Sequence, residues 1–171
     1  MRIIETKVYK IDELSDEAKQ NACDYVRDNW HDFYPWHNDN QESLKEFAKF
    51  LGGKCDWSVS LYGPSSAKIT DLPCYMSEEY ALSDWIQDNS SVILDDCPFT
   101  GFHMDYPLLQ PMRDYLNGKV VNKTMEELIE DGCKQWATDY VNDWEYCYTD
   151  EYILDFLESN EYEFTEEGEL V

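Results

Sequence analysis

Three groups of side chains in this 171-residue sequence have the types and spacing needed to bind a metal ion, to act as acid and base, or to bind a cationic partner. The first group combines imidazole and carboxylate side chains within nine residues: His31, Asp32, His37 and Asp39. Zinc accepts such ligands, and it would also accept Cys97 and His103, which lie close to each other in the sequence. Their spacings match neither a zinc finger nor the H-E-x-x-H pattern, and aromatic residues surround the first group. We therefore interpret the His31/His37 region as structural and predict no bound metal and no other cofactor.

Asp139 and Asp143 form the second group, because a spacing of four residues places both on one side of a helix. They fall on or beside the apolar arc of that helix, where a carboxylate must pair, accept hydrogen bonds or bind a cation. Two neighbouring carboxylates could also act as an acid–base pair. The simpler interpretation is a salt bridge to Arg27, Arg113 or Lys134.

The third group is the acidic C-terminal third of the chain. From Thr124 to the end there are 16 acidic residues, and the only basic residue is Lys134. Carboxylates at i and i+4 of a helix are about 6 Å apart, comparable to phosphates along one DNA strand. Such a face could occupy a groove lined with Lys and Arg; the alternative is a solvated face without a partner. The predicted partner-binding residues are Glu126, Glu127, Glu130, Asp131, Glu145, Asp150, Glu151 and Glu158.

The overall charge restricts the possible partners. The sequence has 37 acidic and 13 basic residues, a formal net charge of −24. Direct binding to nucleic acid works by neutralising phosphates with Lys and Arg, so this composition excludes it. An anionic membrane surface would also repel the chain. A content of 43% hydrophobic and 15% aromatic residues is sufficient for a folded core. The expected partner is a cationic protein or a metal ion.

A long helix over 124–147 must position most of the acidic residues. Thr124 and Glu127 form a capping-box pattern at its start. Eight residues then recur at helical spacing and predict its buried face: Met125, Leu128, Ile129, Cys133, Trp136, Tyr140, Trp144 and Cys147. Thr149 is a suitable N-cap for a further helix that ends near Asn160.

The rest of the chain alternates between helical and extended patterns. We predict strands over 2–11 and 161–165, a hairpin of 55–62 with 67–72 that could pair with the N-terminal strand, and a turn or strand end over 91–95. We predict helices from Ser15 to near Pro35 and over 41–51, 77–89 and 108–117. Residues 1–171 are therefore expected to form a single α+β domain, with a small antiparallel sheet covered by several helices and a long, acidic, amphipathic C-terminal helix.

The cysteines and the N-terminus indicate a reducing compartment. No C-x-x-C pair occurs, the first residues lack the apolar segment of a signal peptide, and no apolar run approaches 18 residues. We predict reduced thiols and a cytoplasmic location. The six cysteines are Cys23, Cys55, Cys74, Cys97, Cys133 and Cys147.

Several segments together resemble a family of small acidic proteins encoded by bacteriophages and prophages. They are D-E-L-S-D-E-A-K, C-P-F-T-G-F, P-M-R-D-Y-L, E-E-L-I-E-D and L-E-S-N-E-Y-E-F-T-E-E-G-E. Members are often labelled "antitoxin of a toxin–antitoxin system". The resemblance implies a phage gene expressed in the cytoplasm of a bacterial host, and it supplies no catalytic residues.

Phage accessory proteins with extreme negative charge include DNA mimics that block restriction or CRISPR machinery. The sequence also lacks a G-x-S-x-G motif, a Cys–His signature and a phosphate-binding glycine loop. We therefore predict a non-enzymatic inhibitor that binds a cationic host defence protein, one that normally binds nucleic acid, through a DNA-mimicking acidic surface. Two alternatives remain: an antitoxin that neutralises a basic toxin, and a metal-dependent enzyme that uses carboxylates or histidines.

Overall fold

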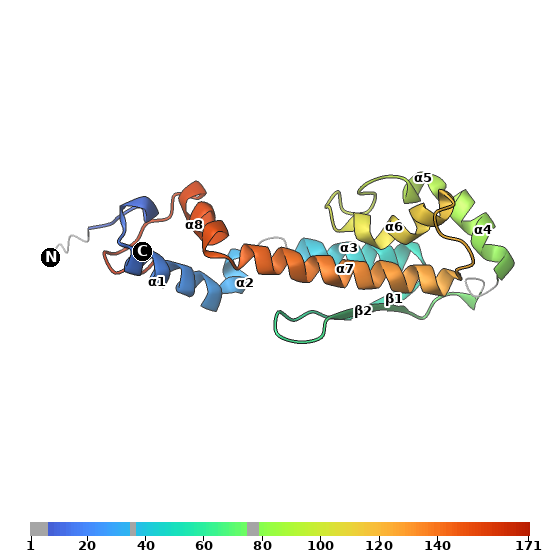
Figure 1. Cartoon of the computed structure of the whole chain (residues 1–171), viewed down its shortest axis with the longest axis horizontal. Coiled ribbons are helices and arrows are strands. Elements are labelled where there is room, and N and C mark those ends of the chain that lie inside the picture. The colour runs from blue at the N-terminus through green and yellow to red at the C-terminus, as the bar shows by residue number, and fades with distance from the viewer. Residues whose placement is uncertain (1–6, 35–36, 75–78) are drawn as a thin grey trace, which may run out of the picture. The chain divides into compact units, whose positions relative to one another are not determined.

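α7 (Met125–Cys147) is the longest helix in the computed structural model, which describes residues 7–34, 37–74 and 79–171 (Figure 1). It begins as predicted. The Thr124 backbone N–H donates to Glu127 Oε2 at 2.8 Å, and the Glu127 N–H donates to Thr124 Oγ1 at 3.2 Å. This reciprocal capping box satisfies two backbone donors at a helix start that would otherwise lack partners.

The chain divides into two compact units, each described by itself below. Unit 1 contains residues 1–35 and 144–171, and unit 2 contains residues 36–143. The last four residues of α7 therefore belong to unit 1. The single-domain interpretation stays a prediction.

Unit 2 is built from helices and one hairpin. Its elements are α3 (His37–Phe50), β1 (Lys54–Ser58), β2 (Ser66–Thr70), α4 (Glu79–Asp88), α5 (Ser90–Ile93), α6 (Asp105–Leu116) and most of α7. β1 and β2 pair antiparallel, with Lys54 opposite Thr70 and Ser58 opposite Ser66. The hairpin is thus confirmed, and in the described part of the chain it forms a two-stranded sheet without the N-terminal segment. Over 91–95, where a turn or strand end was predicted, residues 91–93 belong to α5 and a turn follows at Leu94.

The buried face of α7 organises the core of unit 2. Trp136 is fully buried, donates from Nε1 to the Asn40 carbonyl at 3.1 Å, and meets Tyr140 edge-on at 5.3 Å. Gly132 allows α7 to approach α6, since a Cβ there would lie 2.4 Å from the Leu108 carbonyl oxygen. The predicted apolar arc is confirmed except at its seventh member, Trp144, which is only half-buried.

Buried polar groups fix the irregular segment before α6. Asp105 accepts hydrogen bonds from the N–H groups of Phe99 and Thr100 at 2.9 and 2.8 Å and from Thr100 Oγ1 at 3.0 Å. Arg113 donates from Nε to the Ile93 carbonyl at 2.6 Å. Because backbone groups must be satisfied when buried, these two side chains hold a segment that has no regular structure of its own.

Unit 1 joins the two ends of the chain. Its elements are a 3₁₀ helix η1 (Ile11–Glu13), α1 (Asp16–Asp28), α2 (Trp30–Phe33) and α8 (Asp150–Ser159). Ser15 and Thr149 cap α1 and α8, as predicted. The two predicted terminal strands contribute an isolated antiparallel bridge between Tyr9 and Phe164, with both N–O distances at 2.9 Å; residues 2–6 lie outside the described residues. Gly168 has φ +87°, and a Cβ there would lie 2.1 Å from the Ala18 carbonyl oxygen, so the C-terminal turn packs directly on α1.

These elements define an α+β fold with a small antiparallel sheet, which confirms the predicted class. The long acidic C-terminal helix is also confirmed. None of the described helices is both long enough and apolar enough to cross a membrane.

Candidate partner-binding surface

The eight predicted partner-binding residues divide equally between the two units. Unit 2 holds Glu126, Glu127, Glu130 and Asp131, and unit 1 holds Glu145, Asp150, Glu151 and Glu158. The two halves are therefore described separately.

Three of the four carboxylates in unit 2 are already engaged. Glu127 closes the capping box, Glu130 forms an ion pair with Lys134 at 2.9 Å, and Asp131 forms one with Lys123. Glu126 is exposed and forms no ion pair among the described residues. This half of the predicted set therefore has little charge left for a partner.

In unit 1, only one of the four predicted carboxylates is engaged. Asp150 pairs with Arg27, which also binds Asp24 at 2.8 Å. Glu145, Glu151 and Glu158 are exposed, and in the described part of the chain no cation pairs with them. These three carboxylates are available to a partner.

One residue of this surface was missed by the sequence-based prediction. Asp155 is exposed on α8, four residues after Glu151 and three before Glu158, while Ile153 and Leu157 on the opposite side are buried. Glu151, Asp155 and Glu158 thus form one carboxylate row along the helix. The i, i+4 spacing from Glu151 could have revealed Asp155.

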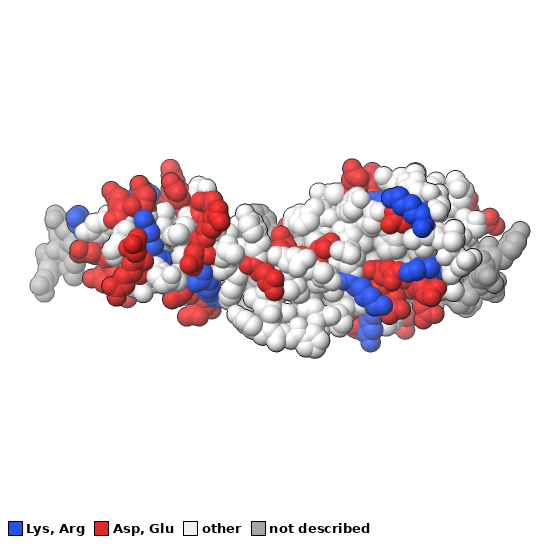
Figure 2. Space-filling view, in the orientation of Figure 1, with Lys and Arg blue, Asp and Glu red and all other residues white. Residues whose placement is uncertain are grey.

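The whole of unit 1 is short of compensating cations. It contains 18 acidic and five basic residues among 63, a net charge of −13, whereas unit 2 contains 19 and eight among 108, a net charge of −11. On the face drawn in Figure 2, acidic side chains crowd over unit 1 with a few basic side chains among them, and in unit 2 acidic and basic side chains also lie beside one another. The net negative charge per residue is therefore about twice as high in unit 1 as in unit 2.

The acids of α8 have opposing effects on helix stability. Asp150 and Glu151 lie in its first turn, where the positive end of the helix dipole favours a carboxylate. α8 has no basic residue in its last turn and carries Glu158 there, where the negative end of the helix dipole disfavours a carboxylate. Glu151 and Asp155 are like charges at i and i+4, which destabilises a helix by about 0.2–0.5 kcal/mol. Helix stability therefore accounts for Glu151, in the first turn of α8, but not for Glu158.

Asp139, on the inner side of α7, does not form the predicted salt bridge with any of the three cations named for it. Arg27 binds Asp150, Arg113 binds backbone carbonyls, and Lys134 binds Glu130. Asp139 is half-exposed and accepts a hydrogen bond from Gln135 Nε2 at 2.8 Å. The three basic residues that were predicted to pair with this carboxylate therefore bind other groups.

The histidine candidates give no metal centre. Among the described residues, no group of three or more His, Cys, Asp or Glu side chains could hold a metal ion. His37 instead contacts Tyr140 through Nδ1 and Gln41 through Nε2, the latter at 2.8 Å. Burial raises the pKa of Tyr140 to about 12, so its hydroxyl stays protonated. These contacts agree with the structural interpretation of His37.

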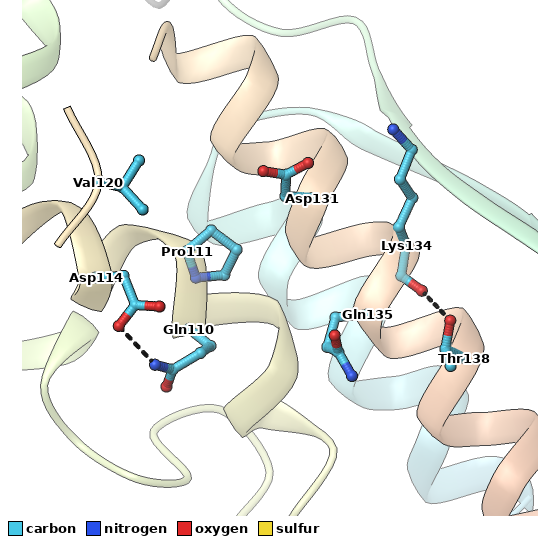
Figure 3. Close-up of a pocket in the computed structure, with 8 residues that line it drawn as sticks. All are labelled: Gln110, Pro111, Asp114, Val120, Asp131, Lys134, Gln135 and Thr138. Carbon is cyan, nitrogen blue, oxygen red and sulfur yellow. Dashed lines mark hydrogen bonds between the residues drawn. The ribbon is translucent and has the colours of Figure 1, made fainter. Parts of the chain in front are cut away.

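A pocket of about 390 Å³ lies between α6 and α7 (Figure 3). Its carboxylates are neutralised locally: Asp114 accepts from Gln110 Nε2 at 2.9 Å and from Lys119 at 3.0 Å, and Asp131 pairs with Lys123. The Thr138 hydroxyl donates to a backbone carbonyl of α7 at 2.9 Å. Gln110 Oε1, by contrast, is buried without a hydrogen-bond partner among the described residues. Because the carboxylates of the pocket are already paired, the exposed carboxylates of unit 1 are the stronger candidate site.

Comparison of the chain with family models, curated proteins and solved structures found no match.

Proposed function

We propose that this protein is a non-enzymatic inhibitor that binds a cationic, nucleic-acid-handling protein of a bacterial host through the exposed carboxylates of unit 1. The observation that supports it is the uncompensated charge of that unit: a net charge of −13 in 63 residues, with Glu145, Glu151 and Glu158 exposed and outside every described ion pair.

The carboxylate row of α8 suits such a partner. Glu151 and Asp155 are four residues apart, which corresponds to about 6 Å along the helix axis, close to the separation of successive phosphates. A cationic groove evolved to bind DNA would therefore meet similar charges at similar intervals. Exposed charges steer association and fix register more than they add affinity. The inhibitor would thus compete with DNA for the groove.

The resemblance to phage and prophage proteins supports a host defence protein as the partner and the bacterial cytoplasm as the location. An inhibitor of this kind needs no catalytic group. It needs only a rigid acidic surface and a partner with the opposite charge.

The test is competition with DNA. The immobilised protein is exposed to a bacterial lysate freed of nucleic acid, and bound proteins are eluted either with duplex DNA or with polyglutamate at equal charge. We expect a cationic protein to bind. Duplex DNA should elute it at a lower concentration of negative charges than polyglutamate does, because DNA and the inhibitor share one groove. Equal elution by both polymers would mean that binding is unspecific charge attraction, and the proposal would then be wrong.

A further inference from the structure

Six aromatic rings form a continuous run over unit 1. Successive ring centroids are separated by 5.4–6.5 Å from Tyr146 to Tyr152, Phe156, Phe33 and Tyr25. Tyr162 lies 5.9 Å from both phenylalanine rings of this run. We call these six residues the aromatic strip: Tyr25, Phe33, Tyr146, Tyr152, Phe156 and Tyr162.

The strip is not part of the buried core. Every one of its members keeps part of its surface in solvent, and the two ends are the most exposed, with Tyr146 at 61% and Tyr25 at 43%. Rings that serve only packing are normally covered, as Phe164 of the same unit is. Exposed aromatic area grouped in one place is typical of a binding surface.

Each ring of the strip directly follows an acidic residue in the sequence. Neighbouring residues on a helix point about 100° apart, so each of the five rings that lie on helices has a carboxylate at its side rather than beneath it. Glu161 and Tyr162 follow α8. All six of these acidic residues are exposed: Asp24, Asp32, Glu145, Glu151, Asp155 and Glu161. The surface thus alternates aromatic faces with negative charges.

We propose that the aromatic strip is the docking site for an extended, arginine-rich segment of the cationic partner. This inference rests on the proposed function and adds the chemistry of the contact. A guanidinium group stacks on an aromatic face and at the same time donates in its plane to carboxylates. Lysine has the same charge but cannot stack in this way. The alternation of rings and carboxylates therefore fits arginine better than lysine.

The spacing also fits an extended chain. Alternate residues of an extended peptide point the same way and are about 6.4–6.8 Å apart. The ring-to-ring steps of the strip are 5.4–6.5 Å. Arginines at alternate positions would thus meet successive rings, with the intervening residues facing away.

The test compares two labelled peptides of equal charge, six Arg-Ser repeats and six Lys-Ser repeats, by fluorescence anisotropy at 0.15 M salt. The parent protein should bind the arginine peptide about tenfold more tightly. The variant Tyr25→Leu/Tyr146→Leu keeps apolar area at both exposed ends but removes the aromatic faces, and the preference should fall to about twofold. Tyr62→Leu is the matched control, since Tyr62 is 91% exposed and lies in unit 2, and it should leave the preference unchanged.

The outcomes separate the inference from the proposed function. Equal binding of both peptides, or an arginine preference that survives in Tyr25→Leu/Tyr146→Leu, would overturn the docking site while leaving charge-driven binding intact. Binding of neither peptide would contradict the proposed function as well. Slow labelling of Cys23, which is buried in unit 1, verifies that each variant is folded.

Discussion

The two units use similar numbers of acidic residues in opposite ways. Each of the seven lysines of unit 2 forms an ion pair with a carboxylate of the same unit. Unit 1 has nearly as many acids in little more than half the length, and only Lys10 and Arg27 form ion pairs within its described residues. Acidic composition alone therefore does not locate a binding surface, and we base the proposed surface on the acidic residues of unit 1 that lack compensating cations.

The difference has a thermodynamic consequence. Uncompensated charge repels itself and destabilises a compact unit, so unit 1 must be held by its core and by contacts between the chain ends. Unit 2 has a larger core and about half the net charge per residue. Four predictions test this contrast, from the largest expected effect to the smallest.

The largest effect is expected in the core of unit 2. Trp136→Ala removes a fully buried ring and its hydrogen bond to the Asn40 carbonyl, so it should lower the free energy of unfolding by about 3–5 kcal/mol. Urea denaturation measures this loss. Tyr62→Ala, at an exposed ring of the same unit, should change stability by less than about 0.5 kcal/mol. A loss below about 1 kcal/mol for Trp136→Ala would mean that α7 does not organise the core.

Alkaline pH should destabilise unit 2 more steeply than unit 1. Burial raises the pKa of Cys133 from 9.0 to about 12 and that of Tyr140 from 10.0 to about 12, whereas in unit 1 it raises the pKa of Cys23 to about 11. Because these pKa values are higher in the folded state, the groups stabilise the fold below about pH 9. That stabilisation is lost as the pH rises through the folded-state values.

Each such group removes at most about 1.4 kcal/mol per pH unit. The urea midpoint should therefore decrease as the pH rises from 9 to 11. Measured from each protein's own midpoint at pH 8, this decrease should be smaller in Cys133→Ala than in the parent. If the variant and the parent lose stability at the same rate, then the Cys133 thiol does not contribute to the alkaline transition.

Salt should protect unit 1 more than unit 2. Raising the ionic strength from 0.01 to 0.15 M shortens the Debye length from about 30 to about 8 Å, which screens self-repulsion. Cys23 and Cys133 are buried free thiols in units 1 and 2, and their labelling rates report local opening. We expect labelling of Cys23 to slow by about fivefold and that of Cys133 by less than about twofold. Peptide mass spectrometry measures both labelling rates. Equal slowing of the two would contradict the claim that self-repulsion is stronger in unit 1 than in unit 2.

Removing the charge of a single carboxylate should change the stability in opposite directions in the two units. Glu158→Gln removes a charge from the C-terminal turn of α8 and should stabilise the protein by about 0.3–1 kcal/mol. Glu126→Gln removes a charge from the first turn of α7 and should destabilise it by a similar amount. Thermal unfolding of both variants in low salt measures the difference. A loss of stability in Glu158→Gln would show that this acid stabilises the fold.

The sequence predicted the local features well because they depend on neighbouring residues. The capping box of Thr124 and Glu127, the cap of α8 at Thr149, and the buried face of α7 follow from propensity and periodicity. Pairing across the chain could not be predicted in this way. Arg27 binds Asp150, 123 residues away, and the bridge of Tyr9 with Phe164 joins the ends of the chain.

The binding surface shows the same limit. Periodicity identified the exposed acids of α7 and α8, but it could not show that lysines engage those near Glu130 and leave those near Glu151 available. The aromatic strip was also beyond periodicity, since its rings come from four helices and the segment after α8. The repeated acid–aromatic pairs in the sequence were the available indication of it.

The central claim is that the available carboxylates of unit 1, and not acidity in general, bind the cationic partner. The most direct measurement is the dissociation constant of the DNA-eluted partner with two variants of equal charge change. Glu145→Lys/Glu151→Lys/Glu158→Lys alters unit 1, and Asp84→Lys/Asp88→Lys/Glu126→Lys alters exposed acids of unit 2. We expect the first to weaken binding by about a hundredfold or more, through like-charge repulsion, and the second by less than about threefold. Equal weakening by both variants, or none by the first, would contradict the claim.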